Sequence, residues 1–273
     1  MKHSCYKAAL LTGLLSLFAV TSVSAHDFWL APEDYAPGAG ARTNVNVLVG
    51  HAMDRTPWPV TPHRVIALRS VGPDGVMDHQ KSVKAYPRLK ALPLRLDTSG
   101  VHIVTMETTS AVSTLGAEKF ANYLAEEGLT PIAIDRGRKN ATDTPGREIY
   151  SRRGKTIINV GSVADPRPDY LTRPLGLTLE IVPTMNYALE TGPIVADIYY
   201  RGELTKGVTI GLVSLDTDDG VVDIALSDEK GRVTLARPET GRWMLHAVWS
   251  DVLEGDDRAE YDTIFSSLSF EIN

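Results

Sequence analysis

The sequence predicts an all-β fold with two β-sandwich-like domains and one short helix. Short runs that alternate polar and apolar residues recur along the chain, such as TNVNVLVG (43–50) and GVHIVTMETTS (100–110). Gly, Pro, Asn and Asp bound these runs, as expected where strands end in tight turns. A strand period of two residues therefore dominates, and one segment shows a helical period instead.

Residues 1–25 have the features of a cleaved secretory signal. Lys2 and Lys7 precede an apolar stretch, and the small residues Val23-Ser24-Ala25 suit a signal peptidase. The stretch is short for a membrane span, so a retained anchor is the less favoured alternative. Cleavage would remove the single cysteine and change the formal charge from −6 to −8. We therefore expect an exported, periplasmic protein without disulfides.

The N-terminal β domain is expected over residues 26–165. Its strands include 43–50, 64–72 and 100–110. A short amphipathic helix is expected near 117–127, because Phe120, Tyr123 and Leu124 are spaced three or four residues apart and Gly128 follows as a stop. We interpret this helix as a cap on one end of the sandwich.

The polar segment 130–150 is expected to be an exposed excursion before a strand at 155–163. Residues 166–174 are rich in proline and poor in apolar residues, which predicts a linker. The C-terminal domain, residues 175–273, contains runs at the 8–12 residue spacing of a β-sandwich, and its sequence is similar to transthyretin-like or Ig-like modules.

Composition and motifs narrow the function classes. The acidic balance argues against nucleic acid as a partner, and no second apolar segment of membrane-spanning length follows the signal, so we expect no direct membrane insertion. The sequence has no GxSxG, GxxxxGK[ST] or GxGxxG motif, which removes the commonest hydrolase and nucleotide-binding interpretations. It also has no HExxH, CxxC or histidine-rich tract.

Four segments resemble the DUF4198 family of exported bacterial proteins: AHDFWL (25–30), EKFANYLAEEGL (118–129), GREIYSRRGKTIINVG (146–161) and GRWMLHAVW (241–249). Proteins of this family are often described as periplasmic components of nickel or cobalt uptake. The resemblance implies a metal-related function in the cell envelope.

Four histidines are candidate metal ligands: His26, His51, His102 and His246. A cut after Ala25 would give His26 a free α-amine beside its imidazole, so one residue would supply two nitrogen donors. Such donors suit nickel, cobalt and copper. Asp27 is placed to add an oxygen ligand or to orient an imidazole.

Alternative interpretations apply to each histidine. His102 and His246 lie in expected strands, with His102 beside Val104 and Met106, where a histidine is more often a satisfied core or edge group. His51 follows a glycine at a strand end. His63 and His79 lie in polar turns and are expected on the solvated surface. The basic run 150–155 either binds an anion through Arg152, Arg153 and Lys155 or forms a solvated basic face.

The leading hypothesis is a non-enzymatic periplasmic protein that binds a divalent transition metal (nickel, cobalt or copper) and assists its uptake. A membrane transporter or an outer-membrane receptor would be its partner. One alternative is a structural or interaction module of an envelope uptake complex. Another is an oxidative copper enzyme that uses the N-terminal histidine as a metal brace.

Overall fold

The protein was analysed as a computed structural model that describes residues 27–51, 53–85 and 89–273. The expected signal, 1–25, and the candidate ligand His26 lie outside the described residues. The described chain is built mainly of strands arranged in sheets, so the predicted all-β fold class is confirmed.

The N-terminal half contains strands β1 (Asp27–Pro32), β2 (Arg42–Gly50), β3 (Arg55–Pro57), β4 (Val65–Gly72), β5 (Gly75–Asp78), β6 (Ala91–Arg95), β7 (Gly100–Thr108), β8 (Ala111–Leu115) and β9 (Gly146–Val160). The C-terminal half contains β10 (Leu179–Pro183), β11 (Ile194–Tyr200), β12 (Glu203–Leu204), β13 (Thr209–Ser214), β14 (Val221–Leu226), β15 (Arg232–Leu235), β16 (Gly241–Val252) and β17 (Tyr261–Ile272). The helices are α1 (Gln80–Ala85), α2 (Ala117–Glu126) and α3 (Thr130–Arg138), with a 3-10 turn at Pro62–Arg64.

One long sheet runs through the molecule. Within the described residues it has nine strands in the order β14-β13-β16-β17-β9-β7-β4-β5, with β8 paired to the lower part of β9. The parallel pairing of β9 with β17 joins strands from the two halves of the chain. A continuous sheet therefore crosses from the expected N-terminal domain, 26–165, to the expected C-terminal domain, 175–273. The linker segment 166–174 between them contains no helix or strand.

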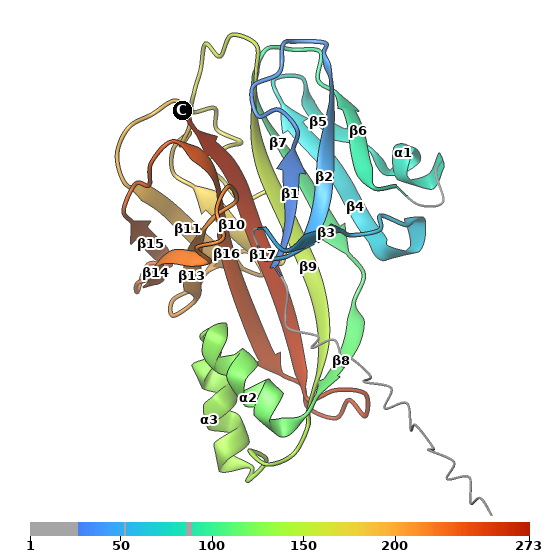
Figure 1. Ribbon diagram of the computed structural model, residues 1–273, viewed down its shortest axis with the longest axis vertical. Coiled ribbons are helices and arrows are strands. Elements are labelled where there is room, and N and C mark those ends of the chain that lie inside the picture. Colours follow the sequence, from blue (N-terminus) through green and yellow to red (C-terminus); the bar gives the residue numbers. More distant parts are fainter. Residues whose placement is uncertain (1–26, 52, 86–88) are drawn as a thin grey trace, which may run out of the picture.

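Two small sheets cover opposite faces of the long sheet (Figure 1). The N-terminal small sheet, β1-β2-β3 with β6, packs on the face that carries Val104, Met106 and Ile158. The C-terminal small sheet, β10-β11-β12 with β15, packs on the face that carries Ile103 and Ile157. Because successive strand residues point to opposite faces, both sandwiches share the long sheet as a common layer.

The helices α2 and α3 form a hairpin at the lower end of the long sheet, on the same face as the N-terminal small sheet (Figure 1). The expected helix near 117–127 is confirmed as α2, and it buries Phe120, Tyr123 and Leu124 against Val248 and Phe265 of the sheet.

The segment 130–150 is largely exposed as predicted, but it is not an irregular excursion, because the structure has α3 and the first part of β9 there. Helix α3 was not predicted because its sequence is mostly polar, and only Ile132 and Arg136 of this helix are buried. The Arg136 guanidinium donates hydrogen bonds to the carbonyl oxygens of Ala141 and Thr144, each at 2.5 Å, and lies 4.9 Å from the Phe120 ring centroid. Two carbonyl oxygens and an aromatic ring thus hold a buried arginine at a core position where the sequence shows no apolar residue, and its Nη1 has no hydrogen-bond partner.

Candidate functional site

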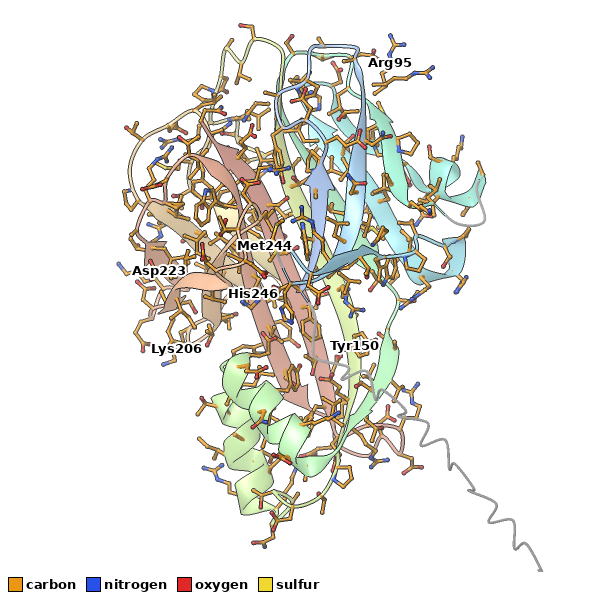
Figure 2. The ribbon with its side chains drawn as sticks, in the orientation of Figure 1. Arg95, Tyr150, Lys206, Asp223, Met244 and His246 are labelled. Carbon is orange, nitrogen blue, oxygen red and sulfur yellow. The ribbon has the colours of Figure 1, made fainter. Side chains whose placement is uncertain are left out.

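His246 lies in the middle of β16 and faces the same side as Met244 and Val248, as the strand period predicts (Figure 2). Its Nδ1 is 3.4 Å from Oδ1 of Asp27 and 3.9 Å from Oε2 of Glu127. The side chains of His246 and Asp27 are each 17% exposed. One imidazole nitrogen therefore meets two carboxylates in a partly screened environment.

A strand glycine makes room for this imidazole. Gly211 in β13 is opposite His246 in β16, and a Cβ added to Gly211 would lie 2.6 Å from the Nε2 of His246. A glycine inside a strand often marks a close approach, and here the approaching group is a histidine ring. The ring is thus held with Nε2 over β13 and Nδ1 towards the two carboxylates.

Glu127 is the residue directly after α2, and its backbone N–H bonds to the carbonyl oxygen of Tyr123. Burial raises the pKa of its carboxyl from the usual 4.5 to about 7, opposed by His246 and assisted by the negative charge of Asp27. The carboxyl end of a helix also disfavours a negative charge. Glu127 therefore exchanges a proton near neutral pH.

Buried polar atoms without a hydrogen-bond partner gather around His246. Within the described residues they include Oε2 of Glu127 and Oγ of Ser267. Ser267 of β17 is opposite His246 of β16, so the two side chains share one face. We call Asp27, Glu127, His246 and Ser267 the junction, because they lie between the N-terminal small sheet and the helical hairpin.

Buried atoms with unmet bonding capacity are uncommon in folded proteins and call for an explanation. The junction offers one nitrogen, two carboxylates and a hydroxyl at the point where β1 begins.

His51 lies beside the same point of the fold. It directly follows Gly50, which pairs with Asp27 in the register of β1 with β2. Its backbone N–H donates to the carbonyl oxygen of Asp54 at 3.0 Å, and its side chain is exposed. The structure therefore brings the backbone of His51 to the start of β1, close to the side of the junction that Asp27 forms.

The structure does not bring His102 together with His246. His246 is opposite Ser267, Ser267 is opposite Gly154, and Gly154 is opposite Met106, which is four residues from His102 on β7. Three strand spacings and four residues correspond to roughly 20 Å.

The environment of His102 fixes its tautomer. The Nε2 of His102 lies 2.8 Å from the carbonyl oxygen of Thr98, which can only accept a hydrogen bond, so Nε2 carries the proton. A Cβ on Gly72 would lie 2.3 Å from Nδ1 of this ring. His102 is thus a buried, hydrogen-bonded histidine at the upper end of the sandwich.

The predicted exposure of His79 is wrong. It was predicted on the solvated surface, but it is 9% exposed, and its Nε2 lies 2.8 Å from Oγ of Ser70. Burial lowers the pKa of this imidazole. His63, in contrast, is exposed as predicted.

The sequence did not reveal Glu127, Ser267 or Gly211 as parts of the junction. Only the glycine left a signal, because TIGLV (209–213) interrupts an apolar strand with a residue that has no side chain. In the part of the chain that the structure describes, no group of three or more His, Cys, Asp or Glu side chains is arranged to hold a metal ion. No described helix has the length and apolar character needed to cross a membrane.

Comparison with protein families gives a match to the family described as "Domain of unknown function (DUF4198)" over residues 23–251. The chain belongs to the DUF4198 family. The resemblance noted in four separate segments is thereby confirmed for most of the chain. Comparison with curated proteins gives no match for this DUF4198 protein.

Among solved structures, the D0-D1 domain of intimin aligns with this DUF4198 protein over 89% of its chain and 97% of the intimin chain, at 9% identity and a TM-score of 0.22. A likeness this slight carries no inference about function.

Proposed function

We propose that this DUF4198 protein is a non-enzymatic periplasmic protein that binds a divalent transition metal, nickel, cobalt or copper, at the junction. The single observation that carries the proposal is the meeting of His246 Nδ1 with the carboxylates of Asp27 and Glu127 at the start of β1. The metal-related function in the cell envelope that the sequence resemblance implies is the same function.

In this proposal the amine and imidazole of His26 complete the site after signal cleavage. His26 directly precedes Asp27, whose carboxylate is 3.4 Å from His246. Two or three nitrogen donors with one or two carboxylates form a ligand set that suits nickel(II), cobalt(II) and copper(II). Asp27 and Glu127 would serve as oxygen ligands or as hydrogen-bond acceptors that orient His246.

The raised pKa of Glu127 fits a cation site. A cation beside this carboxyl favours its ionised form, so binding should displace a proton near neutral pH. The proposal therefore predicts proton release on metal binding, which calorimetry in buffers of different ionisation enthalpy would measure. Glu127→Gln should reduce that release.

The direct test compares protein cut before His26 with protein that carries one glycine inserted between Ala25 and His26. Calorimetry with nickel(II) and copper(II) should show about one ion bound by the first protein and a large loss of affinity in the second. His246→Gln should weaken binding by at least about tenfold, since one nitrogen ligand is lost. His63→Gln is the matched control, because His63 is exposed and its ring contacts Thr61, which is not a residue of the junction. Equal affinity with and without the added glycine would exclude the N-terminal chelate.

A second candidate function, an interaction module for an envelope transporter or receptor, is favoured by one apolar surface. Val222, Ile224 and Leu226 of β14 are exposed on one side of the strand. Ile224 and Leu226 line a cavity of about 870 Å³ between β14 and the helical hairpin, with Ile134 of α3 on its wall. An unpartnered apolar surface of this kind is typical of a protein contact site. If Ile224→Asp abolished uptake while metal binding persisted, this contact would be the functional element.

A further inference from the structure

The basic run in β9 divides between the two faces of the long sheet. Arg153 and Lys155 point to one face, and Arg152 points to the other. The Lys155 ammonium is 2.8 Å from Glu180, and the Nε of Arg153 is 3.4 Å from Glu107. All three cations are at least partly buried, so the predicted solvated basic face is wrong.

Arg152 contacts aromatic rings, whereas the neighbouring cations Arg153 and Lys155 contact carboxylates. Its guanidinium carbon is 4.8 Å from the ring centroid of Tyr150 and 5.8 Å from those of Phe28 and Phe265. Among the described residues no carboxylate oxygen lies within 4.0 Å of this guanidinium, and its buried Nε has no hydrogen-bond acceptor.

The electrostatic surroundings of Arg152 are unfavourable for a lone cation. Burial lowers the pKa of its guanidinium and the charge of Arg64 lowers it further, whereas Tyr150 and Glu148 raise it. Because a guanidinium stays charged at any physiological pH, Arg152 cannot relieve this cost by losing its proton. An anion bound beside the guanidinium would relieve this cost.

Arg64 extends the same aromatic surface. Its guanidinium carbon is 4.6 Å from the Trp58 ring centroid, and Trp58 packs edge-on against Phe28 at 5.5 Å. The described residues place no carboxylate within ion-pair distance of Arg64 either. Two guanidinium groups without carboxylate partners thus share one aromatic wall.

We propose that Arg152, assisted by Arg64, binds a small carboxylate that has an apolar body. A guanidinium matches the two oxygens of a planar carboxylate, and the bond is stronger in partly desolvated surroundings. The partly exposed ring of Tyr150 offers contact to the apolar body, and apart from the Tyr150 hydroxyl the rings around Arg152 have no hydrogen-bond donor for a third or fourth oxygen. A carboxylate is therefore favoured over phosphate. This site does not depend on metal binding at the junction.

Benzoate is the probe for this site, and the assay is calorimetry on folded, metal-free protein in the presence of a chelator. We expect wild-type protein to bind benzoate more tightly than acetate or inorganic phosphate. Arg152→Gln should weaken benzoate binding by about tenfold or more, because a charge-assisted pair is lost. Arg64→Gln should weaken it by about threefold, since this residue acts at longer range. Arg69→Gln, an exposed arginine of the same sheet, is the matched control and should bind as wild type does.

Arg152→Lys tests whether the two-point hydrogen bonding of a guanidinium to a carboxylate is needed in addition to positive charge. The benzoate affinity of this variant should fall although the charge is kept. Circular dichroism establishes that each variant is folded. If Arg152→Gln does not fold, the proposal is tested with Arg152→Lys and Arg64→Gln instead. Benzoate affinity that is unchanged in both of these variants overturns the proposal. Absence of benzoate binding to the wild type, or tighter binding of phosphate than of benzoate, overturns it as well.

Discussion

Replacement of Glu127 by glutamine should make the protein more stable at neutral pH and change how its stability depends on pH. Burial raises the pKa of the Glu127 carboxyl from 4.5 to about 7, so the folded state holds this proton at a pH where the unfolded state has lost it. The stabilisation from the bound proton is fully present below pH 4.5 and is lost as pH rises through 7. Glutamine stays neutral throughout and avoids the loss.

The magnitude follows from the two pKa values. A difference between 4.5 and about 7, at about 1.4 kcal/mol per pKa unit, corresponds to about 3 kcal/mol of unfolding free energy. The Glu127 side chain is 11% exposed, so solvent screens little of this energy. Below pH 4.5 the variant and the wild type should be similarly stable, and the variant should gain steadily up to pH 7.

The assay is urea unfolding of metal-free protein between about pH 4 and pH 8, with the free-energy difference between variant and wild type plotted against pH. Subtraction at each pH cancels the titration of the other groups that both proteins share. Glu118→Gln, at an exposed position of the same helix, is the matched control and should not reproduce the gain between pH 4.5 and about 7, because Glu118 is not among the charges that act on Glu127. Parallel stability profiles for Glu127→Gln and the wild type would refute the assignment of a raised pKa to this carboxyl.

Two further substitutions test the packing that positions the site. Gly211→Val should displace the His246 ring, abolish metal binding and lower the free energy of unfolding by about 1–3 kcal/mol. The control Gly72→Ala, whose new Cβ meets the ring of His102, should lower it by a similar amount and leave metal binding intact. Metal binding retained in Gly211→Val, measured by calorimetry, would contradict this prediction. Lys155→Met should lower the free energy of unfolding, measured in urea, by about 3–5 kcal/mol, because Glu180 loses its buried counter-charge. Three backbone N–H groups still donate hydrogen bonds to Glu180 in this variant. A loss below about 1 kcal/mol would show that those three donors are enough to stabilise the carboxylate.

The sequence predicted local structure well wherever a period was strong. Alternation in GRWMLHAVW placed Met244 and His246 on one face and Leu245 on the other, which β16 confirms. The spacing of Phe120 and Leu124 predicted α2. Prediction from the sequence failed where charged residues occupy buried positions, as Arg136 does in α3 and Lys155 does in β9. A hydrophobic pattern cannot reveal a buried cation whose partners are carbonyl oxygens or a carboxylate far away in the sequence.

The candidate site shows the same division. The sequence by itself determined that His246 faces one side of a strand, since this depends on neighbours in the chain, but it did not predict the strand that begins at Asp27. Only the tertiary structure decided that these residues meet, that Glu127 joins them, and that His102 lies elsewhere. The parallel pairing of β9 with β17 and the packing of β1 across both strands bring distant segments together. Such contacts depend on which strands become neighbours, and the period of a single strand carries no information about its neighbour.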